Sequence, residues 1–233
     1  MARRRPETRF DDLLRAATEV FSERGFRRTQ MADVARRLGV SAGALYGYVA
    51  GKDALFDLAL RRAFGEDVAP PTLPAPAPAA GELADHVRAG MRRRLRTPGL
   101  VDALASPAPA DVEAELTALL GELYDSLATN AAAIRLIERS APDRPELAEL
   151  YFGRGRGGLV ERWRRYLERR IAEGRLRPVP DTAIAARLVL EGVAWFAWHR
   201  LGDPVPQAMD PALARETVVA VLARGLLAGG PRS

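Results

Sequence analysis

Apolar residues recur along the chain at the three- and four-residue spacing of amphipathic α-helices. Near the N-terminus this pattern predicts a first helix over residues 10–24, with Gly25 as its C-terminal stop. It then predicts two shorter helices within residues 26–56, and a further helix that begins after Lys52 and ends near Gly65. Together these segments indicate an N-terminal module of four helices.

The two central helices of this module have the pattern of a helix-turn-helix. Thr29 is placed to cap the first of them, Gly39 permits the tight reversal, and Ser41 is placed to cap the second. In such a motif the second helix is free to enter the major groove of B-form DNA. The spacing therefore indicates DNA binding.

A proline-rich stretch follows the module. Residues 68–81 contain five prolines, which cannot continue a regular helix because they lack an amide hydrogen and have a fixed φ. We therefore divide the chain into a helix-turn-helix domain at residues 1–65, a Pro/Ala-rich linker at residues 66–81 and a helical domain at residues 82–230. A surface loop inside a single domain is the alternative.

Beyond the linker the pattern is helical throughout, without the alternation that predicts strands. A glycine run at Gly153–Gly158 is expected to break or kink the helix that contains it. The expected fold is therefore all-α. The predicted helices of this part cover residues 82–96, about 111–138, 145–173, 181–201 and 211–228.

The formal net charge of +5 is located entirely in the first quarter of the chain. Residues 1–52 contain 11 Lys or Arg against 6 Asp or Glu, whereas the remainder contains 24 of each kind. A local excess of this sort is an electrostatic footprint for a polyanion, and here it coincides with the helix-turn-helix. The arginines before the first helix form a basic arm suited to a minor groove or to phosphates, with a role in solubility as the alternative.

Catalysis, metal binding and membrane insertion find no support in the sequence. Cysteine is absent, and the two histidines, His86 and His199, stand far apart without a metal-binding or catalytic motif. The glycine run follows no predicted strand, so it is not a nucleotide-binding loop. No stretch approaches ~18 uncharged apolar residues, and the N-terminus lacks the apolar run of a secretory signal. We expect a cytoplasmic protein that is not an enzyme and uses no metal or cofactor.

The N-terminal sequence also carries a specific set of short motifs. They are Gly25-Phe26, Thr29, Asp33-Val34-Ala35, Gly39-Val40-Ser41, Gly43-Ala44-Leu45-Tyr46, Tyr48 and Lys52-Asp53-Ala54-Leu55-Phe56. Over about residues 8–60 these positions resemble the DNA-binding domain of the TetR/AcrR family of bacterial regulators. The rest of the chain resembles the family in its helical pattern and length. Gln30, Ala44 and Val49 depart from the family pattern, so the operator sequence does not follow from the resemblance.

The resemblance implies a DNA-binding regulator, in most family members a repressor, that contacts an operator through the helix-turn-helix. The residues expected at the DNA are Arg4, Arg5, Arg28, Thr29, Gln30, Ser41, Ala42, Gly43, Ala44, Tyr46, Gly47, Tyr48 and Lys52. By resemblance Lys52 reaches a phosphate, and Ser41 lies at a helix N-terminus that favours a phosphate oxygen, with a simple cap as the alternative. Tyr46 and Tyr48 cannot share a helix face, so we expect one to turn toward the DNA backbone while the other edges into the groove or packs inward.

The last two predicted helices carry more apolar surface than one packing face requires. By resemblance they pair with a second copy of the chain, which places two recognition helices ~34–36 Å apart on a near-palindromic operator. A wholly intramolecular core is the alternative.

Aromatic side chains of the C-terminal part are candidates for an effector pocket, with core packing as the alternative for each. They are Tyr124, Tyr151, Phe152, Trp163, Tyr166, Trp195, Trp198 and His199. A small effector that fits only a conformation with wrongly spaced recognition helices would release the protein from its operator. An effector-independent DNA-binding or architectural protein is the alternative function.

Overall fold

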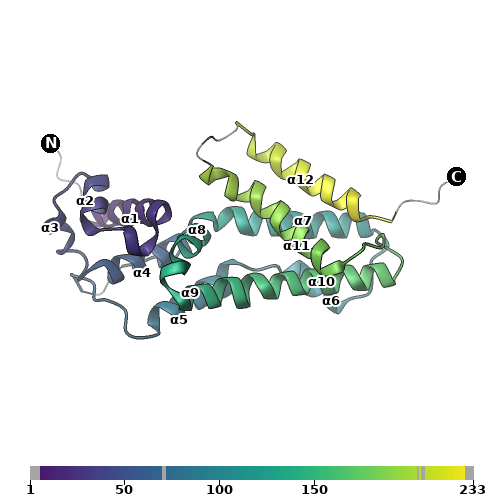
Figure 1. Ribbon diagram of the computed structural model, residues 1–233, viewed down its shortest axis with the longest axis horizontal. Coiled ribbons are helices and arrows are strands. Elements are labelled where there is room, and N and C mark those ends of the chain that lie inside the picture. The colour runs from purple at the N-terminus through teal and green to yellow at the C-terminus, as the bar shows by residue number, and fades with distance from the viewer. Residues whose placement is uncertain (1–5, 70–71, 204, 206–207, 229–233) are drawn as a thin grey trace. The chain divides into compact units, whose positions relative to one another are not determined.

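The computed structural model describes residues 6–69, 72–203, 205 and 208–228. Within this part of the chain the predicted all-α fold is confirmed, since helices joined by turns make up the backbone and the extended pairings are two isolated β-bridges (Figure 1). The chain forms two compact units, unit 1 (Met1–Arg94 and Ala132–Arg154) and unit 2 (Leu95–Ala131 and Gly155–Ser233). Among the described helices, none is long and apolar enough to cross a membrane.

Unit 1 begins with the four helices of the predicted N-terminal module, which are α1 (Pro6–Arg28), α2 (Met31–Leu38), α3 (Ala42–Leu45) and α4 (Lys52–Ala63). The later elements that lie wholly or mostly in this unit are α5 (Glu82–Arg94), α8 (Ala131–Ser140), the 3-10 turn η1 (Ala141–Asp143), α9 (Pro145–Ala148) and the π-helix η2 (Glu149–Arg156). The compact unit thus groups α5 with the N-terminal helices, whereas the division drawn from the sequence assigns residues 82–94 to the helical domain.

Helix α1 is longer than the sequence predicts, and it bends at Gly25. Gly25 has a φ of 76°, which favours glycine, and a Cβ atom there would lie 2.5 Å from the carbonyl oxygen of Arg139. Just past the bend, the ring centroid of Phe26 lies 6.2 Å from that of Phe21 and 5.1 Å from that of Phe56. This aromatic cluster joins the end of α1 to α4.

The N-cap of α2 is displaced by one residue from the predicted position. The cap residue is Gln30, whereas Thr29 is buried and its hydroxyl donates a hydrogen bond of 2.7 Å to the carbonyl oxygen of Gly25. The expectation that Thr29 caps the helix is therefore wrong, because its hydroxyl is bonded to the last turn of α1. The carboxylate of Asp33 accepts a hydrogen bond of 3.0 Å from the main-chain N–H of Gln30, as in a capping box.

The reversal between α2 and α3 follows the prediction. Gly39 ends α2 with a φ of 75°, and the main-chain N–H of Val40 donates to the carbonyl oxygen of Ala35 at 3.0 Å. Ser41 occupies the N-cap position of α3 with an extended backbone, although its side chain makes no capping hydrogen bond. Leu45 is fully buried, so it fixes the short α3 onto the rest of the module.

The elements of unit 2 are α6 (Pro98–Ala105), α7 (Val112–Thr129), α10 (Gly157–Ala172), α11 (Thr182–Ala197), η3 (His199–Gly202) and α12 (Pro211–Leu226). The pattern predicts no helix between residues 96 and 111, so α6 is an addition to the expected elements. Pro98 begins the helix, where a missing amide hydrogen has no cost and the fixed φ suits the first turn.

Two long helices predicted in this part of the chain are interrupted. The segment 111–138 divides at Asn130, whose side-chain amide donates a hydrogen bond of 2.7 Å to the carbonyl oxygen of Ser126 and so ends α7. The segment 145–173 contains the π-helix η2 before α10 begins. The glycine run lies across the junction of η2 and α10. The distortion expected there takes the form of the wider π-helical turns that precede α10.

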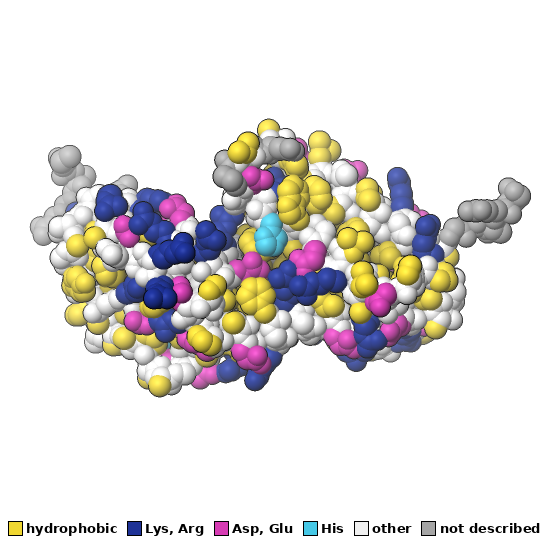
Figure 2. All heavy atoms as spheres, viewed as in Figure 1, with side chains coloured by type: hydrophobic (Ala, Val, Ile, Leu, Met, Phe, Trp, Pro, Cys, Tyr) yellow, Lys and Arg dark blue, Asp and Glu magenta, His cyan; other side chains and the backbone are white. Residues whose placement is uncertain are grey.

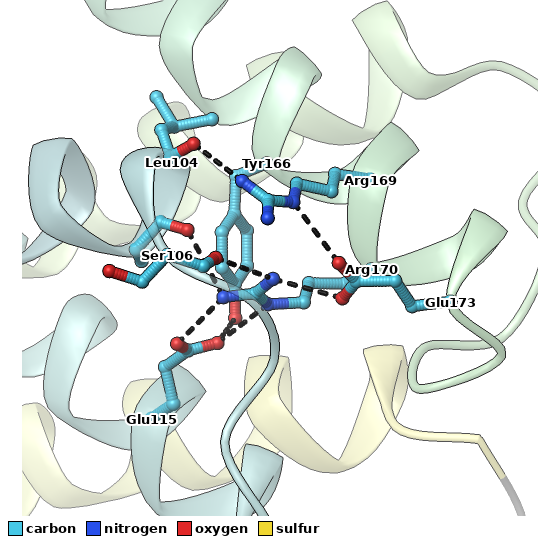
Figure 3. Close-up of polar contacts among 8 residues, drawn as sticks. Leu104, Ser106, Glu115, Tyr166, Arg169, Arg170 and Glu173 are labelled. Carbon is cyan, nitrogen blue, oxygen red and sulfur yellow. Dashed lines mark hydrogen bonds and ion pairs between the residues drawn. The ribbon is translucent and has the colours of Figure 1, made fainter.

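Unit 2 contains an ion cluster around Arg170, whose side chain is fully buried (Figure 3). Its guanidinium donates to both carboxylate oxygens of Glu115, at 2.8 and 2.9 Å, and to a carboxylate oxygen of Glu173 at 2.9 Å. A further hydrogen bond of 3.1 Å reaches the carbonyl oxygen of Ala103. These bonds raise the pKa of Arg170 above its usual value, and they tie α6, α7 and α10 together.

Candidate nucleic-acid interface

The second helix of the helix-turn-helix is a single turn that presents small residues to solvent. Ser41, Gly43, Ala44 and Gly47 are exposed, and Ala42 is partly exposed. Five of the predicted DNA-facing residues therefore lie together around α3. With no long side chains among them, this surface permits close approach of main chain to a duplex but offers few groups that read base edges.

The two predicted tyrosines have different surroundings, as expected for residues that do not share a face. Tyr46 is 51% exposed, which leaves its ring and hydroxyl accessible at the end of α3. Tyr48 is partly buried, and its ring centroid lies 6.3 Å from that of Phe10 in α1. Tyr46 is thus the better placed of the two to contact a duplex.

Lys52 has an arrangement that the sequence did not predict. Its ammonium group donates to three carbonyl oxygens at the end of α1, at 3.1 Å from Phe26, 3.5 Å from Arg27 and 3.2 Å from Thr29. The same ammonium lies 4.4 Å from the ring centroid of Phe26. These contacts join α4 to α1 within the protein, and the phosphate contact expected of Lys52 stays a prediction.

The remaining predicted residues of unit 1 fall into three groups. Arg28 and Gln30 are exposed beside the start of α2, where both side chains are accessible to a polyanion. Thr29 is 1% exposed, which keeps its side chain away from any ligand in solution. Arg4 and Arg5 lie outside the described residues.

Several other arginines of the module are already paired with carboxylates. The guanidinium groups of Arg24 and Arg36 lie 2.9 and 3.3 Å from the carboxylate of Asp33. The hydrogen bond from the main-chain N–H of Gln30, together with these cations, lowers the pKa of the Asp33 carboxyl. Arg37 forms ion pairs with two glutamates of α1. Figure 2 nevertheless shows Lys and Arg side chains gathered over the surface of the N-terminal helices. Arg28 is exposed at the end of α1 and forms no ion pair within the described part of the chain.

The turn at η1 in unit 1 makes contacts that the sequence does not predict. The main-chain N–H of Arg27 donates to the carboxylate of Asp143 at 3.0 Å, and the guanidinium of Arg144 lies 3.9 Å from the ring centroid of Phe26. Arg144 also forms an ion pair with Asp53 at the start of α4. The turn at η1 therefore packs against the end of α1, just before α2 begins, and against the start of α4. No local pattern signals this, because its partners are more than 90 residues away in the sequence.

The candidate effector residues are divided between the two units. Tyr151 and Phe152 belong to unit 1, where their ring centroids lie 5.1 Å apart. The other six belong to unit 2 and contain two ring pairs, Trp163 with Tyr166 and Trp198 with His199. The remaining two are Tyr124, whose hydroxyl donates to the carbonyl oxygen of Phe196 at 3.2 Å, and Trp195, which is exposed.

Burial distinguishes these side chains further. Trp163, Tyr166, Tyr124 and Trp198 are buried in unit 2, as core packing would require. Burial also raises the pKa of the Tyr166 hydroxyl, which donates to Glu115 at 3.0 Å. The described residues contain no group of three or more His, Cys, Asp or Glu that could hold a metal ion.

Two family models match the sequence. The N-terminal match is to bacterial regulatory proteins of the tetR family, over residues 13–59. The second is to the C-terminal domain of AefR-like transcriptional repressors, over residues 127–224. The first match covers most of α1, all of α2 and α3 and the first two thirds of α4, where the geometry above places an exposed helix-turn-helix.

Curated relatives and solved structures agree with these matches. The chain is 27% identical over 196 residues to the HTH-type transcriptional repressor KstR2 of Rhodococcus jostii strain RHA1, which covers 83% of this chain and 81% of that protein. The KstR2 of Mycolicibacterium smegmatis is 22% identical over 203 residues, covering 86% and 83%. The structure of the ketosteroid transcriptional regulator KstR2 of Mycobacterium tuberculosis has a similar fold, with a TM-score of 0.59, 19% identity and coverage of 97% and 98%.

Proposed function

Because the chain belongs to the TetR family of bacterial regulatory proteins, which are DNA-binding transcriptional regulators and not enzymes, we propose that it is a homodimeric repressor that a small effector releases from a near-palindromic operator. We assign DNA binding to residues 1–65 and dimerisation with effector binding to residues 82–230. The observation that carries the proposal is the exposed surface around α3, which ends in the accessible ring of Tyr46.

The proposed DNA contacts divide by chemistry. Tyr46 supplies an aromatic ring and a hydroxyl, and the small residues of α3 allow the backbone to approach the major groove closely. Arg28 and Gln30 flank the groove, where Arg28 contacts phosphate and adds salt-sensitive affinity. Lys52 and Thr29 make hydrogen bonds at the end of α1 that stabilise the helices next to this surface. The basic arm of Arg4 and Arg5 adds affinity without sequence preference.

The proposed dimer interface is the exposed apolar face of α11 and α12. On α11, Ile184 and Leu188 are one turn apart and 71% and 64% exposed, and Trp195 follows two turns later. On α12, Leu213 and Val221 are 63% and 64% exposed. Figure 2 shows hydrophobic side chains at the surface over these helices. Burying such a face against its copy by a two-fold operation removes apolar area from water and spaces two recognition helices for one operator.

One buried group supports effector binding in unit 2. The indole N–H of Trp163 has no acceptor within the described residues, although its side chain is fully buried. A buried donor without a partner costs about 1–3 kcal/mol, so a ligand oxygen that accepts from it would gain affinity. The effector we propose is accordingly a largely apolar molecule with at least one oxygen acceptor.

Selection of bound fragments from a pool of genomic DNA tests the proposal directly. We expect enrichment of a near-palindromic sequence beside one or a few genes, and light scattering of the purified protein at micromolar concentration is expected to give the mass of a dimer. Failure to enrich any sequence would contradict specific DNA binding. A monomeric mass would contradict the homodimer. If the operator is found but no small molecule weakens binding to it, the effector part of the proposal fails and an effector-independent regulator remains.

A further inference from the structure

The proline-rich stretch after α4 pairs with the turn that follows the recognition helix. Ala75 and Val49 form an isolated parallel β-bridge. The main-chain N–H of Ala75 donates to the carbonyl oxygen of Tyr48, and that of Ala50 donates to the carbonyl oxygen of Ala75, both at 2.8 Å. All of these residues lie in unit 1. The segment expected to be a linker is therefore hydrogen-bonded to the helix-turn-helix itself.

The local sequence explains why the pairing falls at Ala75. Proline flanks it on both sides, and a residue before proline is confined to extended conformations. Because prolines lack an N–H, few residues of the stretch can donate a main-chain hydrogen bond. Ala75 is 2% exposed and Val49 is fully buried, so both residues of the bridge also lie in the apolar core beside the helix-turn-helix. The prolines fix the conformation in advance, which reduces the entropy lost on pairing.

Helix α3 needs outside support of this kind. It has a single turn from Ala42 to Leu45, and so short a helix has few internal hydrogen bonds to hold its orientation. Beyond it, the turn from Tyr46 to Gly51 connects to α4. The two hydrogen bonds with Ala75 fix the main chain of that turn on both sides of Val49. The orientation of Tyr46 and of the exposed residues of α3 depends on the same turn.

We propose that residues 72–78 form a brace that positions the recognition helix for DNA binding, with the main chain of Ala75 as its contact point. The brace itself carries no charged side chain, so its role is to orient α3 and not to bind phosphate. This inference rests on the proposed DNA-binding function. It makes Ala75 a positioning residue whose effect on DNA affinity is indirect.

Two matched substitutions in the same stretch test the brace. Ala75→Pro removes the N–H that donates to Tyr48, whereas Ala77→Pro makes the same change at an exposed residue between the next two prolines. We expect Ala75→Pro to weaken binding to the selected duplex by about five- to tenfold, the loss expected for one structural hydrogen bond and its neighbours. Ala77→Pro is expected to stay within about twofold of the parent protein.

A second readout separates positioning from general instability. Binding to random duplex depends on the sum of basic charge and hardly on the orientation of α3. We therefore expect Ala75→Pro to leave the affinity for random duplex within about twofold, whereas partial unfolding would lower both affinities. Without DNA, the amides of residues 46–51 are expected to exchange with deuterium faster in Ala75→Pro than in Ala77→Pro.

If Ala75→Pro does not fold, Pro76→Ala takes its place, with Pro78→Ala as its control. Pro76→Ala keeps both hydrogen bonds but releases the constraint on Ala75, and we expect it to lower affinity for the selected duplex by about two- to fivefold. Equal affinity of each test variant and its control, with unchanged amide exchange, would overturn the brace while the parent protein still bound its selected site. Failure of the parent protein to select any site is a different result, because it contradicts the proposed function.

Discussion

The side-chain ammonium of Lys52 lies 3.1 Å from the main-chain carbonyl oxygen of Phe26 and 4.4 Å from the centroid of the Phe26 ring. Together with the contacts to Arg27 and Thr29, this places a cation at the C-terminal end of α1, where the last carbonyl groups have no partner within the helix. The first residue of α4 thus stabilises the last turn of α1. Lys52, which the sequence motif associates with DNA, therefore also connects two helices of the module.

Lys52→Met separates these two roles. We expect the free energy of unfolding to fall by about 1–3 kcal/mol, because partly buried carbonyl oxygens lose their charged donor. The slope of log affinity for duplex against log salt is expected to remain as in the parent protein, since no phosphate contact is lost. Arg28→Met is the control, and it should leave stability unchanged while the magnitude of the salt slope decreases by about 1. The reverse pattern, in which Lys52→Met alone changes the slope, would assign the phosphate contact to Lys52.

The two tyrosines of the motif are expected to respond differently to replacement by alanine. Tyr46→Ala removes an exposed ring, so we expect unchanged stability and a loss of about tenfold in affinity for the selected duplex, equivalent to ~1.4 kcal/mol. Tyr48→Ala removes a ring that packs against Phe10, so the free energy of unfolding should fall by about 2 kcal/mol. Thermal melting and titration of labelled duplex measure the two quantities. A Tyr46→Ala protein that binds as tightly as the parent would remove this residue from the interface.

Asp33 gives a pH-dependent prediction at the start of α2. The Gln30 amide and neighbouring arginines lower the pKa of its carboxyl below the ordinary value of 3.8, so ionised Asp33 stabilises the folded state above that value. This contribution is lost as the pH falls through the lowered pKa. We expect Asp33→Asn to be less stable than the parent at pH 7, on the order of 1 kcal/mol for a charged hydrogen bond, and the difference to fade toward pH 3.

Chemical unfolding of both proteins between pH 3 and 7 measures this difference. Asp85→Asn, at an exposed carboxylate of α5, is the control and should change stability little over the same range. A difference between Asp33→Asn and the parent that is constant with pH would show that the charge of Asp33 does not contribute.

The sequence predicts those features of unit 1 that depend on neighbours in the chain. The reversal at Gly39 is confirmed because glycine readily adopts the positive φ that it needs. Ser41 stands at the predicted N-cap position of α3, but its side chain makes no capping hydrogen bond. Lys52 and the Ala75 bridge could not be predicted in this way, since their partners lie more than 20 residues distant. A lone lysine or alanine has no periodicity that identifies a distant carbonyl oxygen.

The same distinction applies to features of the C-terminal part of the chain that the sequence does not reveal. The helix α6 is not predicted, because the sequence alone does not say on which side of Pro98 a helix lies, and Pro98 begins α6. Arg170 lies in a run of arginines and glutamates typical of a solvated helix face. Its burial depends on Glu115 and on Ala103 in other helices, and only the assembled unit reveals it.

Replacement of Arg170 tests how far this buried cluster stabilises unit 2. Arg170→Met leaves the carboxylate of Glu115 without its bidentate partner, so we expect a loss of about 3–5 kcal/mol in the free energy of unfolding. The double variant Arg170→Met with Glu115→Gln removes the unpaired charge as well and is expected to recover part of this loss. Chemical unfolding curves of both variants measure the effect. Equal stability of the single and double variants would mean that the charge of Glu115 is not buried.

The apolar face of α11 and α12 gives the prediction that bears most directly on assembly. Leu188 is 64% exposed on α11, and a glutamate there would be buried against its symmetry-related copy if this face forms the dimer. We expect Leu188→Glu to give the mass of a monomer by light scattering at micromolar concentration and to bind the selected duplex at least tenfold more weakly, because a monomer contacts a single half-site. Val101→Glu is the matched control, since Val101 is 53% exposed on α6 of the same unit and outside the proposed face. That variant should remain dimeric with unchanged affinity. A dimeric Leu188→Glu beside a monomeric Val101→Glu would move the interface from α11 to α6, and the spacing of the two recognition helices would then have to be derived anew from that surface.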